Sequence, residues 1–165
     1  MLALLHNIRS LYNVGSMFRT ADAAGVEKLY LCGITPTPLD RFGTVRSQLQ
    51  KVALGAEKTV LWEKCVSTSP LIDRLKKEGY YIVAVEQNKK AIPYYSFPPV
   101  AVSLSLERIA IVMGNELAGL PQSILLKADT IVEIPIRGTM VRQAHHPRQS
   151  GRGKESLNVS VAFGI

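Results

Sequence analysis

The sequence has few cysteines and lacks a long hydrophobic run. Cys32 and Cys65 are the only cysteines among the 165 residues. Two cysteines are too few for a disulfide framework and are not spaced as metal ligands, so we expect two free, buried thiols. No apolar run is long enough to cross a bilayer, and the apolar part of the N-terminal MLALLHNIRS is too short for a signal peptide. These features predict a cytoplasmic protein with no membrane association.

Two common phosphate-binding motifs are also absent. The chain contains neither G-x-G-x-x-G nor G-x-x-x-x-G-K-[ST], and GNELAG at 114–119 matches neither of them. The glycine-rich first turn of the common methyltransferase fold is missing too. These absences argue against a nicotinamide-dependent enzyme and against a nucleoside triphosphatase.

The chain is basic, with a formal net charge of +7 and a pI near 9.6. Such a charge favours an anionic partner, such as nucleic acid. However, most of the excess lies in one segment without acidic residues, which contains Arg137, Arg142, Arg148, Arg152 and Lys154. The rest of the chain is only mildly basic, so charge alone is weak support for RNA or DNA binding.

Apolar runs alternate with segments of helical periodicity along the chain. Strands that are apolar on both faces and alternate with helices predict a mostly parallel sheet covered by helices on both faces. The length suits a single α/β domain over residues 1–165, and there is no internal repeat. We expect strands at 2–5, 28–34, 58–62, 80–87, 108–114 and 130–136, helices at 13–26, 45–55, 69–78 and 123–129, and the start of a helix or a strand within 156–165.

The helix at 13–26 raises a question about Arg19. Asn13 is expected to cap this helix, and an apolar stripe with helical spacing includes Val14, Met17, Phe18, Ala21 and Gly25. Arg19 lies on the opposite face, where it could be a solvated side chain paired with Asp22 or a functional group. The helix alone does not decide between them.

Three loops are placed where ligands bind in parallel sheets, beyond the carboxyl ends of the strands. They are VEQNKK at 85–90, MGNELAGL at 113–120 and IPIRGTM at 134–140. Each contains Gly, Pro or Asn, and its backbone can approach a ligand closely.

Three separated blocks also follow a recognisable order. NIRSLYNVGSMFRTADAAGV lies near the start, IVMGNELAGL follows, and IPIRG leads to ESLNVSVAFGI. In order and spacing they resemble the three motifs of the SpoU–TrmH family of RNA ribose methyltransferases, in the SPOUT superfamily. The resemblance covers nearly the whole chain. It implies a parallel sheet with a deep trefoil knot in its C-terminal part, a homodimer whose partner subunit completes each active site, and methyl transfer from S-adenosylmethionine to a ribose 2′-hydroxyl of tRNA or rRNA.

The resemblance also implies which residues hold the cofactor. The backbone of Gly114 would lie against S-adenosylmethionine, with a turn glycine as the alternative. Ile134 and Leu157 would contact the adenine, with core packing as the alternative. The cofactor-binding set that we expect is Gly114, Ile134, Leu157, Val85, Glu86, Ile136 and Gly138.

The implied catalytic set is Arg19, Asn13, Glu116, Ser156 and Asn158. Because a free arginine stays protonated, we expect Arg19 to hold an RNA phosphate and lower the cost of deprotonating the hydroxyl. Asn13 would orient the arginine or the ribose, and Glu116 would align Arg19. The alternatives are a helix cap for Asn13 and a helix N-terminal acid for Glu116.

Two departures from the family pattern limit the transfer of these roles. A basic insertion at 139–154 separates IPIRG from SLN, and its His145 and His146 lack further ligand-spaced partners, so we expect no metal. The insertion could be disordered or could grip phosphate. The chain also ends at Ile165, within the helix that follows the third motif, and we expect no separate RNA-binding domain. A catalytically impaired RNA-binding homologue is therefore the alternative to an active methyltransferase.

Overall fold

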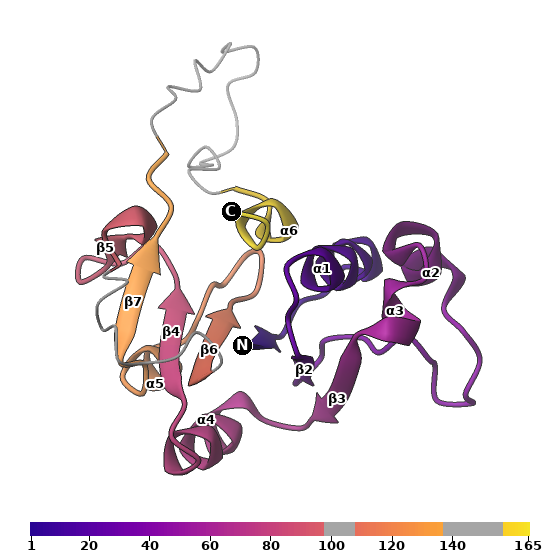
Figure 1. Cartoon of the computed structure of the whole chain (residues 1–165), viewed down its shortest axis with the longest axis horizontal. Helices are drawn as coiled ribbons and strands as arrows, with labels where there is room; N and C mark the ends of the chain where they lie inside the picture. Colours follow the sequence, from indigo (N-terminus) through magenta and orange to yellow (C-terminus); the bar gives the residue numbers. More distant parts are fainter. Residues whose placement is uncertain (98–107, 137–156) are drawn as a thin grey trace, which may run out of the picture.

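The computed structural model describes residues 1–97, 108–136 and 157–165, which form a seven-stranded sheet (Figure 1). The strand order is β3-β2-β1-β6-β4-β7-β5, and all neighbouring strands are parallel. The expected parallel sheet is therefore confirmed. The strands are β1 (Leu2–His6), β2 (Lys28–Cys32), β3 (Leu61–Cys65), β4 (Tyr81–Val85), β5 (Ile92–Pro93), β6 (Ile109–Met113) and β7 (Thr130–Glu133).

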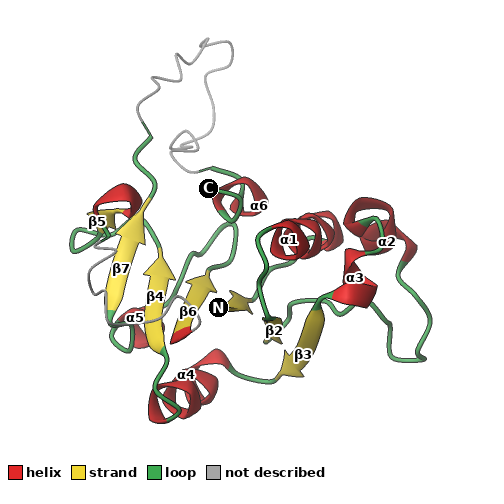
Figure 2. Cartoon of the chain, in the orientation of Figure 1, coloured by secondary structure: helices red, strands yellow, loops and turns green. Residues whose placement is uncertain are grey.

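Helices pack on both faces of this sheet (Figure 2). Side chains of α1, α2, α3 and α6 share one buried cluster with β1 and β2, and side chains of α4 and α5 share a second cluster with β4 and β6. The helices are α1 (Leu11–Ala23), α2 (Ser47–Ala53), α3 (Ala56–Thr59), α4 (Thr68–Lys77), α5 (Gln122–Leu125) and α6 (Val159–Ala162), with a 3₁₀ turn η1 (Tyr94–Ser96). None of these helices is long and apolar enough to span a membrane.

The central strand β1 shows why the strands are apolar on both faces. Ala3 and Leu5 point into the cluster beneath α1, whereas Leu2 and Leu4 point into the cluster beneath α4. Alternate residues of a strand face opposite sides, so a strand covered on both sides needs apolar residues throughout.

Two local expectations were wrong. The helix cap is Ser10, whose Oγ accepts a hydrogen bond from the Asn13 backbone N–H at 3.2 Å, so Asn13 lies in the first turn and is not the cap. The strand expected at 58–62 starts later, because Ala56–Thr59 forms α3. Gly55 has a φ of 99°, which separates α3 from α2.

Some of the predicted residues lie outside the described residues. These are Gly138, Ser156 and the insertion at 139–154. The trefoil knot remains a prediction. Within the described ranges, no group of three or more His, Cys, Asp or Glu side chains is arranged to hold a metal ion.

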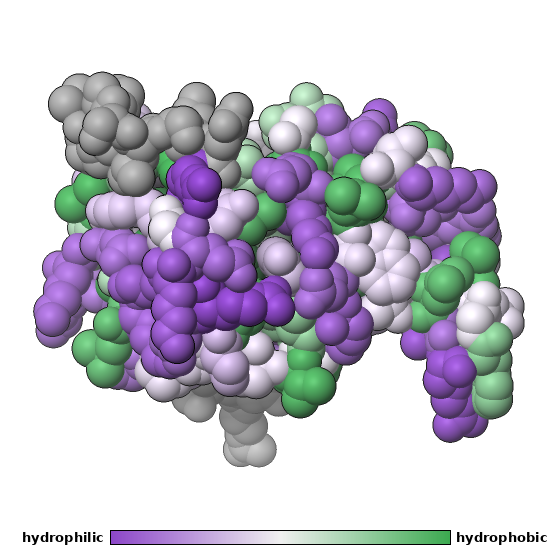
Figure 3. Space-filling view, turned by 60° about the horizontal axis from the view of Figure 1, so that its bottom comes forward, coloured by the Kyte–Doolittle hydropathy of each residue, from purple (hydrophilic) through white to green (hydrophobic). Residues whose placement is uncertain are grey.

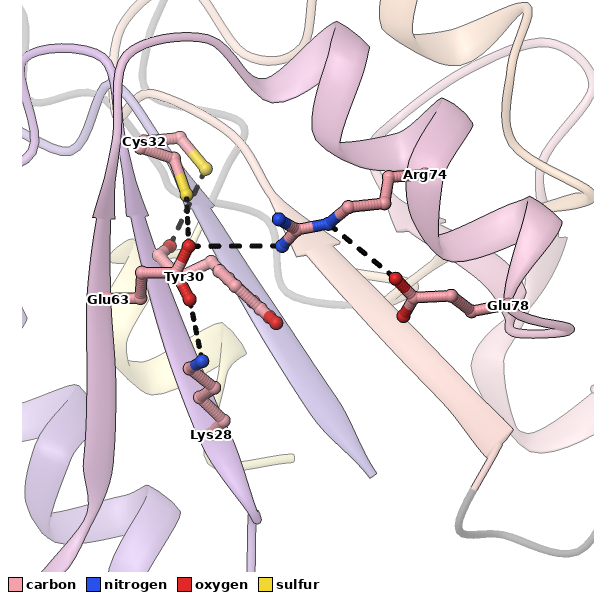
Figure 4. A network of polar contacts seen from close by, with 7 residues as sticks. Lys28, Tyr30, Cys32, Glu63, Arg74 and Glu78 are labelled. Atoms are coloured by element: carbon pink, nitrogen blue, oxygen red, sulfur yellow. Dashed lines mark hydrogen bonds and ion pairs between the residues drawn. The ribbon is translucent and has the colours of Figure 1, made fainter.

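A polar network joins α4 to the edge of the sheet (Figure 4). Glu63 accepts a hydrogen bond from Lys28 Nζ at 2.6 Å and pairs with Arg74 at 3.9 Å, and both cations lie over the ring of Tyr30. Beside this network both cysteines are free thiols, but only Cys32 is buried as expected, and Cys65 is partly exposed. Burial raises the pKa of Cys32 to about 12. Such a thiol is inert at neutral pH.

Gly15 lets α1 and α2 approach closely. A Cβ at this position would lie 2.6 Å from the backbone oxygen of Leu49 and 3.2 Å from Cβ of Val52. We expect Gly15→Ala to force α2 away and to lower the free energy of unfolding by about 1–3 kcal/mol, measured by urea denaturation. Ser16→Ala is the control and should change it by less than about 0.5 kcal/mol. Wild-type stability of Gly15→Ala would contradict this packing.

Candidate functional site

The site lies where the strand order reverses. From β1 the chain builds β2 and β3 on one side of the sheet, and the later strands lie on the other side, next to β6. The loops that follow β1 and β6 therefore leave the same edge in different directions, which is where parallel sheets form ligand crevices. Asn115 Nδ2 donates to the backbone oxygen of Asn7 at 2.7 Å and joins the two loops.

Three residues from the three sequence blocks form a hydrogen-bonded row. Asn13 Nδ2 donates to Glu116 Oε1 at 3.0 Å. Asn158 Nδ2 donates to Asn13 Oδ1 at 3.3 Å. Asn158 also caps α6, because its Oδ1 accepts from the Ser160 backbone N–H at 2.9 Å. The Glu116–Asn13–Asn158 row thus connects the loop after β6, the first turn of α1 and the start of α6.

Glu116 is a carboxylate held by several donors at the N-terminus of α1. Besides Asn13, the backbone N–H groups of Arg9 and Ser10 point to its oxygens at 3.3–3.5 Å. Partial burial favours the protonated form, but these hydrogen bonds outweigh it and lower the pKa of Glu116 from its ordinary value. Glu116 is therefore ionised at neutral pH, and it fits a role in positioning α1 better than that of a proton acceptor.

This lowered pKa makes stability depend on pH. A carboxyl whose pKa is lower in the folded state adds stability above its unfolded pKa of about 4.3, and that stability is lost as pH falls through the folded value. We expect Glu116→Gln to be less stable than wild type by about 1–2 kcal/mol at neutral pH, and the difference to shrink on acidification. Urea denaturation at several pH values measures both.

The matched control is Glu27→Gln, which removes an exposed acid and should change stability little. A constant difference between Glu116→Gln and wild type at every pH would contradict the assignment.

A cavity of about 310 Å³ adjoins this row, within the size range of small-molecule sites. Its walls come from the ends of β4, β6 and β7, the turn at 114–119 and α6. Glu116 is part of the wall, so the row and the cavity share a residue. The structure brings together all but one of the expected cofactor residues as lining: Val85, Glu86, Gly114, Ile134, Ile136 and Leu157. The exception, Gly138, lies outside the described residues.

The cavity combines acidic and apolar groups. Glu86, Glu116 and Glu133 line it, and no lysine or arginine does among the residues that the structure describes. Its apolar lining includes Ile134 and Leu157. Despite the basic chain, this local charge favours a ligand that carries positive charge next to an apolar ring, and it disfavours phosphate groups.

Two glycines shape the turn that forms one wall. A Cβ on Gly114 would lie 2.7 Å from the backbone carbon of Gly119, so the turn closes against Gly114 itself. Gly119 has a φ of 64° and would contact Glu86 if it carried a side chain. Glu86 Oε2 accepts from the Leu120 backbone N–H at 2.7 Å and holds the turn. Gly114 is thus a turn glycine that also lines the cavity.

Arg19 is not part of this cavity. Its side chain is exposed on the outer face of α1 and makes no hydrogen bond or ion pair with another described residue. The alternative pairing with Asp22 is not formed, and Asp22 accepts a hydrogen bond from Thr59 at 2.9 Å. Within one chain, the structure places Asn13, Glu116 and Asn158 together and leaves Arg19 outside.

Sequence reasoning missed two asparagines that hold the site's loops. Asn7 has a φ of 55°, and its Oδ1 accepts from the Ile34 backbone N–H at 3.0 Å. Asn115 Oδ1 accepts from the backbone N–H groups of Leu117 and Ala118 at 2.9 Å. Asn7 follows β1 directly and Asn115 follows β6 after Gly114, and asparagine just beyond a strand favours such turns. That signal could have identified them.

Comparison with known proteins gives the same family at the levels of sequence and structure. The family model described as SpoU rRNA Methylase family matches residues 1–141. The 23S rRNA (guanosine-2′-O-)-methyltransferase RlmB of Coxiella burnetii is 32% identical over 165 residues, covering 100% of this chain and 55% of that protein. The chain thus spans about half the length of the curated relatives it matches.

Solved structures agree. The AdoMet-bound rRNA methyltransferase from Sinorhizobium meliloti aligns with a TM-score of 0.75 and 25% identity, over 99% of this chain and 52% of that one. The A. aeolicus TrmH/SpoU tRNA modifying enzyme aligns with a TM-score of 0.72 and 25% identity, over 99% of this chain and 70% of that one. With the family model matching most of its length, this chain belongs to the SpoU rRNA methylase family.

Proposed function

We propose that this chain binds S-adenosylmethionine in the cavity and methylates a ribose 2′-hydroxyl of ribosomal or transfer RNA. The observation that carries the proposal is the Glu116–Asn13–Asn158 row beside an acidic and apolar cavity. The cofactor fits this lining, because it combines a positively charged sulfonium with an adenine ring. The names of the relatives cover both substrate classes, since one is a 23S rRNA methyltransferase and another a tRNA modifying enzyme.

In methyl transfer, some residues of the chain would bind the cofactor and others would position α1. Ile134 and Leu157 would pack on the adenine ring, and Glu86 and Glu133 would offset the positive charge. S-adenosylmethionine supplies an electrophilic methyl group when bound. The row fixes α1 against the cavity, so that groups on α1 keep their position relative to the acceptor.

Arg19 would act on the acceptor side. Its guanidinium stays protonated, so it would hold an RNA phosphate and stabilise negative charge developing on the 2′-oxygen as the proton leaves. Its exposure, away from the cavity of its own chain, suits contact with RNA at the site of a second subunit.

We infer on this basis that the chain forms a homodimer. A second, apolar cavity of about 270 Å³ supports this, because it lies on the sheet face next to α6 and is lined by Val83, Ile109, Ile111 and Phe163 among others. Tyr94 and Ile165 also line it and are exposed, and exposed apolar side chains at an apolar cavity mark an interface between proteins. Light scattering should give twice the 18.1 kDa chain mass. A monomer at micromolar concentration would contradict the inference.

The function is tested by transfer of a tritiated methyl group to unmodified 23S rRNA and tRNA transcripts. Ribose methylation mapped to one nucleotide is the expected result. Cofactor and RNA binding without transfer would favour the catalytically impaired homologue instead. A cytoplasmic location, where these RNAs are modified in bacteria, is part of the proposal.

A further inference from the structure

The connection between β2 and α2 contains a small hairpin that the proposed function does not use. Leu39 and Val45 form an antiparallel bridge. The Asp40 backbone N–H donates to the Thr44 oxygen at 2.9 Å, and the Arg46 N–H donates to the Pro38 oxygen at 2.9 Å. We call residues 38–46 the tip hairpin. It lies in the connection that leaves the carboxyl end of β2 at Cys32 and leads to α2 at Ser47.

The turn of the tip hairpin is held by one side chain. Asp40 Oδ1 accepts from the backbone N–H groups of Phe42 at 2.8 Å and Thr44 at 2.9 Å. Gly43 takes a φ of 79°, a backbone conformation that suits glycine in such a turn. Internal hydrogen bonds therefore fix the backbone at Arg41 and Phe42.

The two residues at the tip form an exposed aromatic and cationic pair. Phe42 is 76% exposed, and it belongs to no buried cluster of the described residues. The Arg41 guanidinium lies over its ring, 4.6 Å from the centroid. Figure 3 shows this part of the chain projecting from the body at the lower right, with hydrophilic and hydrophobic side chains next to each other. Packing in the folded chain therefore does not explain why an aromatic side chain and an arginine lie at this exposed tip.

We propose that Arg41 and Phe42 bind an unpaired nucleotide of the RNA substrate. Phe42 stacks on the base, and Arg41, whose guanidinium lies over the Phe42 ring, contacts phosphate. Proteins bind single-stranded RNA with little sequence preference through such stacking and phosphate contacts. The inference rests on the proposed function, because that function makes RNA the partner. It adds a contact outside the catalytic cavity.

Charge and position favour RNA over a protein partner. Arg46 and Lys51 follow the tip, whereas the nearby Asp40 is already engaged by backbone N–H groups. The tip hairpin leads into α2, which packs on α1, the helix that carries Asn13 and Arg19. An RNA strand bound along α1 and α2 would therefore also meet the tip hairpin.

The test measures binding of a fluorescent single-stranded RNA of about 12 nucleotides to the full chain with S-adenosylmethionine present. Phe42→Ala is expected to weaken binding about 5-fold or more, and Phe42→Tyr, which keeps the stacking ring, should bind like wild type. Asp40→Ala should weaken binding by loosening the turn, and Asp40→Asn, which keeps the acceptor, should restore it. In the methyl-transfer assay Phe42→Ala should raise KM for RNA and leave kcat unchanged.

Leu126→Ala is the matched control, because Leu126 is 71% exposed but lies at the end of α5. It should bind the RNA like wild type. Wild-type affinity in Phe42→Ala, or no RNA binding by the wild-type chain, would overturn the inference. Calorimetry with S-adenosylmethionine alone separates failure of this inference from failure of the proposed function. A wild-type chain that does not bind the cofactor would count against the proposed function.

Discussion

Arg19→Ala is expected to slow methyl transfer by about 100-fold or more while S-adenosylmethionine binds with unchanged affinity. The reason is the separation seen in the structure. Arg19 is exposed and lines no part of the cavity, so its loss would remove the proposed contacts to RNA and to the developing oxyanion without disturbing the cofactor. The measurements are single-turnover transfer of a tritiated methyl group and calorimetry with the cofactor.

Arg19→Lys tests whether the geometry of the side chain matters. Lysine keeps the charge but lacks the planar fork that binds phosphate through two bonds, so activity should be recovered only in part. Arg74→Ala is the control, since Arg74 is exposed on α4 across the sheet and should not affect transfer. Equal rates for Arg19→Ala and wild type would exclude Arg19 from the mechanism.

Gly114→Val is expected to abolish cofactor binding and to destabilise the protein by about 3 kcal/mol or more. A Cβ alone would lie 2.7 Å from the carbon of Gly119 and 2.8 Å from the nitrogen of Leu120, and both are backbone atoms that cannot rotate away. The turn at 114–120 must therefore open. That opening moves a wall of the cavity and the carboxylate of Glu116 together.

Thermal unfolding and cofactor calorimetry report the two effects of this substitution. Gly164→Ala is the matched control, because a Cβ there would meet its nearest neighbour, the Val161 oxygen, at an ordinary 3.4 Å. Gly164→Ala should be close to wild type in both measurements. A Gly114→Val protein that keeps both stability and affinity would show that the turn does not form the cofactor wall.

The strands that are buried on both faces were predictable from the sequence. β4 and β6 lie at the centre of the sheet, and their short runs of apolar, β-branched residues are typical of strands buried on both faces. The start of β3 was missed because α3 has only one turn, too short for a periodic pattern to show. β5 has two residues and no pattern at all.

Part of the candidate site was predictable from the sequence, but Arg19 lies outside it and its hydrogen bonds were not predictable. The order of the three motifs indicated that Asn13, Glu116 and Asn158 belong together, and the structure joins them in one row. Local sequence also made Asn13 a plausible cap, and only tertiary structure shows that Ser10 takes that place and frees Asn13 for Glu116. The acidity of the cavity could not be read from a chain whose net charge is +7.

Titration of the wild-type chain with S-adenosylmethionine and, separately, with ATP tests the central claim most directly. Three glutamates line the cavity, and no lysine or arginine does among the residues described. The cationic cofactor should therefore bind saturably, with one site per chain, and the anionic nucleotide should show no saturable binding. No saturable heat with S-adenosylmethionine, or equal binding of ATP, would contradict the account.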